Sequence, residues 1–133
     1  MKTIATVSVV STDTPYRQNI HTGGHDLLAD EPASAGGQDA GPAPYDYVLT
    51  GLGACTAITL QMYAQRKGWD IGELKVELTL SKNHEGDASI ERVLHSSATL
   101  SDEQWERMLD IASKTPVTKT LQAGSPISTR RAA

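Results

Sequence analysis

The feature that most constrains the fold is one long helical pattern, which runs from Pro44 to Lys67. At about 1.5 Å per residue such a helix approaches about 36 Å, which is long for so small a chain. Pro44 is favourable in a first helical turn, and Gly68 is a typical position for the helix to end. Side chains that recur at helical spacing predict a buried stripe, which consists of Val48, Leu52, Cys55, Ile58, Thr59 and Met62.

Small residues keep the middle of this helix thin. Glycine inside a helix costs about 1 kcal/mol relative to alanine, so glycines just before Cys55 indicate that another backbone or a substrate comes close. The chain also has no Phe, 2 Trp and 4 Tyr, which is few aromatic residues for a self-sufficient core. We therefore predict a homodimer with this helix near its centre and with a thin surface made by Gly51, Gly53, Ala54 and Ala57.

Length and charge fit one cytoplasmic domain that spans residues 1–133. The net charge of −4 gives no reason to expect a nucleic acid or an anionic membrane as partner. No stretch approaches the roughly 20 apolar residues that a membrane span needs. Ser and Thr interrupt the apolar N-terminal residues, so we expect no signal peptide, and a single free cysteine then fits a reducing compartment.

Alternating and β-branched segments predict strands on both sides of the helix. The turn Gly23-Gly24 reads as the tip of a hairpin, and a second turn lies around Gly86. Because the strands are joined by short turns, we expect mainly antiparallel sheets and an α+β fold with the order βββ-α-ββ-αα-β. The predicted strands are 3–10, 16–21, 25–30, 73–82, 89–99 and 127–131.

Two shorter helices follow the second hairpin. Ser101 and Gln104 form a capping box, which opens a helix whose buried face is predicted to hold Trp105, Met108, Leu109 and Ala112. Pro116 begins a further short helix that reaches Gln122. The segment 31–43 is rich in Pro, Gly and Ala and is predicted to be a loop, of a length that is often functional or mobile.

Cys55 is the only cysteine of the chain and has two interpretations. A thiolate is a strong nucleophile that can begin redox chemistry, although a chain with one cysteine must obtain a second thiol from elsewhere. A free cysteine also packs like a small hydrophobic residue, and in mid-helix it gains nothing from an N-terminal dipole. The pattern alone favours packing.

Metal binding is the weakest of the candidate functions. His21 and His25 flank the Gly-Gly turn, with Asp26 adjacent, and could face each other across the hairpin. Zinc sites need three or four ligands, and no further ligand is in evidence. We therefore expect solvated histidines, no metal and no cofactor.

The stretch DEPASAGGQDAGPAPYDYVLTGLGACTAITLQMYAQRKGW, residues 30–69, resembles the signature of the OsmC/Ohr superfamily of osmotically inducible and organic hydroperoxide resistance proteins. The resemblance continues through residues 90–92 and 111–121, and it is nearest to the small OsmC-like branch. It implies an intertwined homodimer in which antiparallel sheets from both chains wrap around long central helices. It also implies a peroxidase with two cysteines, in which the first becomes a sulfenic acid and the second resolves it as a disulfide.

The resemblance assigns roles to individual residues. Cys55 matches the attacking cysteine, whereas the resolving cysteine falls on Thr115. The family Glu, which with an Arg holds the thiolate ready, falls on Tyr45, and Asp46 is the acidic neighbour. The family Arg comes from the N-terminal sheet, where Arg17 is the only arginine.

These matches imply a one-cysteine peroxidase for organic hydroperoxides in the oxidative stress response, with an external thiol as reductant. Cys55 is the expected nucleophile, and Arg17, or Arg92 in its place, is the expected cation. The alternative is a non-catalytic dimer that binds a small apolar ligand between its subunits. The residues expected to line the pocket are Tyr45, Asp46, Leu52, Ile58, Met62 and Thr115.

Overall fold

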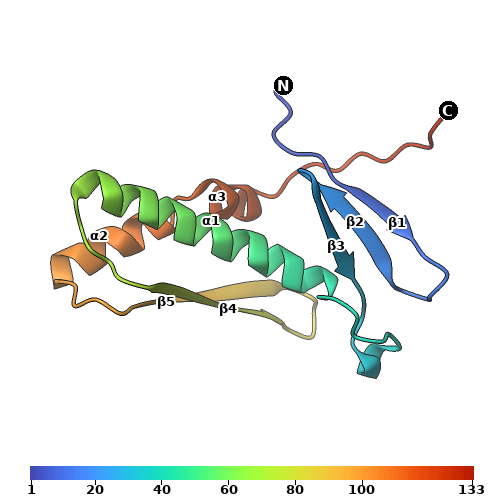
Figure 1. The fold of residues 1–133 in the computed structure, drawn as a ribbon, viewed down its shortest axis with the longest axis horizontal. Coiled ribbons are helices and arrows are strands. Elements are labelled where there is room, and N and C mark those ends of the chain that lie inside the picture. The colour runs from blue at the N-terminus through green and yellow to red at the C-terminus, as the bar shows by residue number, and fades with distance from the viewer. The chain divides into compact units, whose positions relative to one another are not determined.

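The structure is a computed structural model that describes residues 1–133, and its α+β organisation confirms the predicted fold class. The chain forms two compact units, Met1–Val48 and Leu49–Ala133 (Figure 1). One antiparallel sheet has three strands and the other has two. None of the helices combines the length and the apolar character that crossing a bilayer requires.

The first unit contains a meander of β1 (Ser8–Ser11), β2 (Gln18–Thr22) and β3 (His25–Ala29). Gly23 and Gly24 make the predicted turn, with φ angles of 56° and 78° that glycine adopts readily. The prediction of a first strand at residues 3–10 was wrong in its bounds. Ser8 already pairs with His21, near the end of β2, so the residues before Ser8 have almost no strand left to pair with.

The loop after β3 is organised around a buried carboxylate. Asp30 is only 2% exposed. Its carboxylate accepts hydrogen bonds from the backbone N–H groups of Glu31 (2.8 Å), Gln38 (3.2 Å) and Ala40 (3.1 Å). A short 3-10 turn at Ala33–Ala35 lies inside this loop. The segment that the sequence predicts as a loop is therefore tied at both ends to one side chain.

Helix α1 (Pro44–Lys67) begins and ends where the sequence predicts. At its start, the Asp46 carboxylate accepts a hydrogen bond of 2.9 Å from the backbone N–H of Ala43. At its end, Gly68 has a φ of 68°, a left-handed conformation that closes helices and favours glycine. Local capping chemistry thus fixes both ends of the helix.

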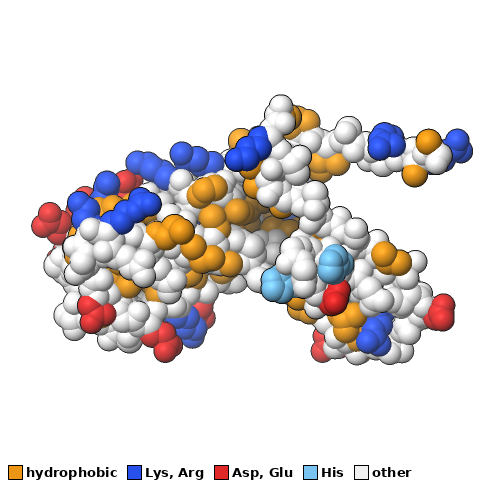
Figure 2. Space-filling view, turned by 45° about the horizontal axis from the view of Figure 1, so that its top comes forward, with side chains coloured by type: hydrophobic (Ala, Val, Ile, Leu, Met, Phe, Trp, Pro, Cys, Tyr) orange, Lys and Arg blue, Asp and Glu red, His pale blue; other side chains and the backbone are white.

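The predicted buried stripe of α1 is only partly right. The side chains that the chain itself buries are Leu52, Thr56, Leu60 and Ala64. In contrast, Val48, Ile58 and Met62 are 39%, 53% and 54% exposed. Apolar residues occur on more than one side of α1, so their spacing could not decide which side packs inward. Figure 2 shows hydrophobic side chains gathered on the surface of the larger unit.

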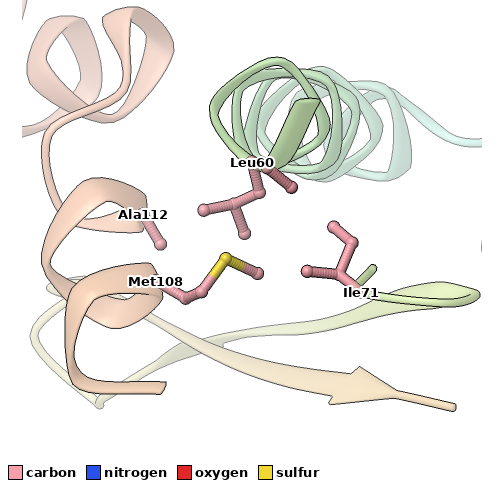
Figure 3. Close-up of a cluster of buried hydrophobic side chains, with 5 residues drawn as sticks. Leu60, Ile71, Met108 and Ala112 are labelled. Carbon is pink, nitrogen blue, oxygen red and sulfur yellow. The ribbon is translucent and has the colours of Figure 1, made fainter. Parts of the chain in front are cut away.

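The second unit adds a hairpin of β4 (Leu74–Lys82) and β5 (Ala88–Ser96), followed by α2 (Asp102–Ala112) and α3 (Pro116–Ala123). Helix α1 lies across this hairpin with α2 beside it (Figure 1). In Figure 3, Leu60 of α1 points toward Met108 and Ala112 of α2, and Ile71 closes the cluster. The capping box of Ser101 and Gln104 is confirmed.

Three predictions in this unit need correction. Leu109 is 54% exposed rather than buried, because Met108 and Ala112 turn the neighbouring face of α2 inward. The return strand ends at Ser96, because its partner there, Leu74, is the first residue of β4. No strand forms at 127–131, where Ile127 is 91% exposed.

Candidate functional site

Cys55 lies in the middle of α1 with a half-buried free thiol. One turn earlier, a side chain at Gly51 would meet open space, whereas a Cβ at Gly53 would lie 2.8 Å from Cδ1 of Leu78. Gly53 therefore allows α1 to approach β4 closely. Gly51 faces open space and has no side chain, so the backbone of α1 is uncovered there. The thiol is neither sealed in the core nor fully exposed, so a reagent or a substrate can approach it.

The guanidinium of Arg92 is bound to the residue that follows Cys55. Its Nη1 donates hydrogen bonds to Oγ1 of Thr56 (2.8 Å) and Oγ1 of Thr118 (2.9 Å). Its Nη2 donates to the backbone carbonyl of Ala112 at 2.7 Å. Thr56 is the residue directly after Cys55, so the guanidinium is anchored next to the position that carries the thiol.

Two further hydroxyl contacts complete this network. Oγ1 of Thr115 and Oγ1 of Thr118 are 2.6 Å apart. Thr56 Oγ1 donates to the carbonyl of Leu52 at 2.7 Å. Thr56, Thr115 and Thr118 are all buried. A connected set of hydrogen bonds thus joins α1, β5, the end of α2 and the start of α3 around Arg92.

The electrostatics of Arg92 connect it to Cys55. Desolvation by burial lowers the pKa of Arg92, and the coulombic interaction with Cys55 opposes that shift. The three hydrogen-bond acceptors of the guanidinium are neutral oxygens, and no carboxylate forms an ion pair with it. The guanidinium is therefore a partly desolvated cation that neutral groups hold in place.

Arg17 is in a different environment within the first unit. It follows the turn between β1 and β2, where its backbone N–H donates to the carbonyl of Thr14 at 3.3 Å. Its charge helps to lower the pKa of Asp30, a shift caused chiefly by the backbone hydrogen bond from Ala40. The carboxylate on which the Arg17 charge acts is therefore Asp30.

The other residues predicted for the site are distributed over both units. Thr115 is 1% exposed at the residue that precedes α3, and Leu52 is 5% exposed on the inner side of α1. Tyr45 is 52% exposed in the first turn of α1, beside the capping residue Asp46. Met62 is 54% exposed on the outer side of the same helix. Of this set, the hydrogen-bond network around Arg92 includes Thr115 and the carbonyl of Leu52.

A shallow hollow of about 410 Å³ lies on the second unit between α1 and β4. Small and apolar residues line most of it, namely Leu49, Gly53, Ala54, Ala57, Val76 and Leu78, together with Thr50. Ala54 is the residue directly before Cys55. The hollow therefore offers an apolar surface on the part of α1 that contains Cys55.

The histidines do not gather into a metal site. Nδ1 of His21 lies 2.8 Å from Oδ1 of Asp26, and both side chains are largely exposed. His25 pairs with Thr22 in the hairpin register. No group of three His, Cys, Asp or Glu side chains converges anywhere in the chain.

Sequence reasoning missed Thr56 and Thr118, and it named Arg92 only as a substitute. Arg92 shares its strand face with Ile90 and Leu94, and the alternation of β5 could have indicated that it turns inward. The spacing of Thr115 and Thr118 places both hydroxyls on one side of α3. No sequence signal shows that β5, α2 and α3 converge on α1.

The comparisons with known proteins agree with this fold. Residues 36–130 match the family model described as OsmC-like protein. A search of the curated proteins gave no match.

Solved structures with the same architecture come from several bacteria. A protein from Psychrobacter arcticus 273-4 is 18% identical, with a TM-score of 0.78 and coverage of 90% of each chain. An OsmC-like protein from Mycoplasma pneumoniae is 20% identical, with a TM-score of 0.72, over 92% of this chain and 89% of that one. The organic hydroperoxide resistance protein OhrB of Bacillus subtilis is 22% identical, with a TM-score of 0.64, over 90% and 91%. At such identities the likeness shows the fold alone.

Proposed function

The chain belongs to the OsmC-like protein family, and from this premise we propose that it is a thiol-dependent peroxidase for organic hydroperoxides. The observation that carries the proposal is a half-buried Cys55 followed by Thr56, whose hydroxyl accepts a hydrogen bond from a guanidinium that has no carboxylate partner. Thiolates, not thiols, attack peroxides, and a nearby cation favours the thiolate. The OhrB protein of Bacillus subtilis, which shares the fold, is named for organic hydroperoxide resistance.

The proposed reaction begins with attack of the Cys55 thiolate on the outer oxygen of the hydroperoxide. An S–O bond forms as the O–O bond breaks, sulfur is oxidised by two electrons, and the alkoxide product takes a proton to become an alcohol. The Cys55 sulfenic acid then reacts with an external thiol, which releases water and leaves a mixed disulfide. A second external thiol attacks that disulfide and returns Cys55 to its reduced state.

The external thiol is required because Thr115 occupies the position that the family resemblance assigns to the resolving cysteine. The hydroxyl of Thr115 is buried against Thr118 and cannot form a disulfide. We expect a small or protein thiol of a reducing cytoplasm to serve as reductant, in the setting of an oxidative stress response. This makes the proposed enzyme a one-cysteine peroxidase.

We further propose that both units work as a single OsmC-like domain in a homodimer. Support comes from the outer side of α1, where Ile58 and Met62 stay more than half exposed in the single chain. Apolar surface of this kind on a central helix is typical of a face that a second subunit covers.

The test is consumption of cumyl hydroperoxide and of hydrogen peroxide by the wild type and by Cys55→Ser, with dithiothreitol and with glutathione as reductants. We expect turnover by the wild type, a preference for the organic peroxide and no turnover by Cys55→Ser. Mass spectrometry after one equivalent of peroxide should show a sulfenate or a thiol adduct on Cys55. If Cys55 in the folded protein resists excess cumyl hydroperoxide while the denatured protein is oxidised, the peroxidase proposal fails.

The apolar hollow between α1 and β4 favours a second candidate, a dimer that binds a small apolar ligand without catalysis. Its volume of about 410 Å³ lies in the range of small-molecule sites. Ala57→Leu would fill part of this hollow and should weaken binding of a fluorescent apolar probe in that case. If Ala57→Leu and the wild type bind such a probe equally, the hollow is not a ligand site.

A further inference from the structure

Packing alone does not explain why an arginine occupies position 92 in the second unit. It lies in β5 opposite Leu78 of β4, on the strand face that carries apolar side chains toward the helices. An arginine at such a position gives up part of its hydration, which is costly unless its charge and its N–H groups find partners. Its N–H groups have hydrogen-bond acceptors. The group that balances its positive charge has still to be identified.

The hydrogen bonds to Arg92 come from three directions and are all neutral. Thr56 on α1, Thr118 on α3 and the carbonyl of Ala112 at the end of α2 accept from the two Nη atoms at 2.7–2.9 Å. Each of these acceptors is buried, so the guanidinium cannot swing away without leaving buried oxygens unpaired. The network therefore fixes the position of the cation without reducing its charge.

Within the second unit, the ionisable groups around Arg92 leave Cys55 as the candidate partner for its charge. On α1 the group is Cys55, which acts on Arg92 by a coulombic interaction. Near the end of α2, Asp110 already pairs with Lys114 and Arg107. On β5, the neighbouring Glu91 is exposed on the opposite face of the strand, on β4 the residue opposite is Leu78, and on α3 Lys119 is exposed.

We propose that Arg92 is the positioning residue that holds the Cys55 thiolate, and that Thr56, Thr118 and the Ala112 carbonyl replace a carboxylate tether. This inference rests on the proposed peroxidase for its biological meaning. Arg17 already acts on Asp30 within the first unit. The arrangement also explains how the site dispenses with a glutamate at Tyr45, because an arginine held by hydroxyls and a carbonyl needs no acidic partner to stay in place.

The proposal predicts that Cys55 discriminates between reagents by charge. A guanidinium beside the sulfur attracts an anionic alkylating reagent and does not affect the approach of a neutral one. The rate of iodoacetate relative to iodoacetamide therefore measures the local positive charge, and the ratio cancels changes in thiolate fraction and in general access to the thiol. A residue with a purely structural role would change both rates together.

The experiment compares this ratio at neutral pH for the wild type, Arg92→Lys, Arg92→Gln, Arg17→Gln and the exposed control Arg66→Gln. We expect Arg92→Gln to lower the ratio about fivefold, the factor for two hydrated unit charges at contact distance. Arg92→Lys should restore part of it, because it returns the charge without the planar fork. Arg17→Gln and Arg66→Gln should match the wild type. A ratio that falls in Arg17→Gln and stays unchanged in Arg92→Gln overturns the assignment.

A second measurement leaves Arg92 in place, in case Arg92→Gln does not fold. The side-chain ¹⁵N resonance of Arg92 should shift with pH in the wild type, with the same midpoint as alkylation of Cys55, and should stay flat in Cys55→Ser. A resonance that is flat in both proteins, or that shifts equally in both, overturns the proposal. Neither measurement uses a peroxide, so loss of the peroxidase proposal and loss of this assignment can be told apart.

Discussion

Two charged side chains of this protein, the buried Asp30 and the half-buried Arg92, are held in opposite ways. Asp30 is surrounded by backbone N–H groups, which stabilise its negative charge, whereas Arg92 is surrounded by hydroxyl and carbonyl oxygens, which accept from its N–H groups. The first arrangement shapes a loop, and the second fixes a cation between α1, α2 and α3. Both show how polar backbone and threonine groups can substitute for ion pairs in a buried site.

The Asp30 arrangement predicts a dependence of stability on pH. The backbone hydrogen bond from Ala40, with those from Glu31 and Gln38, lowers the pKa of Asp30 although desolvation opposes the shift. A carboxyl group whose pKa is lowered by folding stabilises the protein above its unfolded pKa of about 3.9 and loses that contribution as the pH falls through the folded pKa. Asp30→Asn should therefore lower the melting temperature at neutral pH, and its difference from the wild type should shrink below about pH 4.

Thermal unfolding followed by circular dichroism between about pH 2 and pH 7 measures this effect. The control is Asp13→Asn, because Asp13 is an exposed aspartate of the same unit. A constant gap between Asp30→Asn and the wild type over the whole pH range would show that Asp30 acts by shape and not by charge.

A substitution at the start of α3 can test the family resemblance. Thr115 precedes Pro116, the first residue of α3, and its hydroxyl reaches the network that surrounds Arg92. If α3 presents this position to Cys55, Thr115→Cys should restore an intrachain disulfide after treatment with organic peroxide. Mass spectrometry of the non-reduced protein would detect the loss of two hydrogens, and the exposed control Ser113→Cys should not form it. Absence of the disulfide in both variants would mean that the position lies outside disulfide reach of Cys55.

One side of α1 is packed against the rest of the second unit, and another side faces open space. The side with Leu60 and Ala64 packs on α2 and the hairpin, whereas a side chain at Gly51 would meet only open space in the single chain. For an isolated chain, Gly51→Ala should stabilise the helix by about 1 kcal/mol. If a partner helix packs on this thin surface, the added methyl group should instead weaken the assembly.

We expect the second result for Gly51→Ala, namely a lower melting temperature and a weaker dimer. The matched control is Gln65→Ala, an exposed position on the same helix. Chemical unfolding together with analytical ultracentrifugation gives both quantities. A gain in stability with no change in the association constant would contradict contact at this surface.

At the scale of the whole molecule, the exposed apolar side of α1 predicts a stable homodimer. Met62 is 54% exposed, and a negative charge there would be buried without a partner in the assembled protein. Met62→Glu should therefore dissociate the dimer at micromolar concentration, while Gln61→Glu, which adds the same charge at the adjacent exposed residue, should not. Sedimentation velocity measures both, and a wild type that sediments as a folded monomer would refute the prediction.

Elements that depend on local chemistry could be predicted from the sequence. The bounds of α1, the capping box at Ser101 and the turn at Gly23-Gly24 were all predicted correctly. Each rests on signals within a few residues of the chain, such as a proline, a capping side chain or a glycine with positive φ. The family resemblance could also be recognised from the sequence, because the matching residues form a continuous stretch around Cys55.

The packing of whole elements decides which side of α1 faces inward and which groups hold Arg92. Apolar residues lie on both sides of the helix, and the choice of Leu60 over Ile58 depends on what α2 and the hairpin present to it. Arg92 meets Thr56 and Thr118 across separations of 36 and 26 residues. Such contacts are set by the packing of whole elements, because local propensity fixes where a helix begins but carries no information about the neighbour that its side chains will meet.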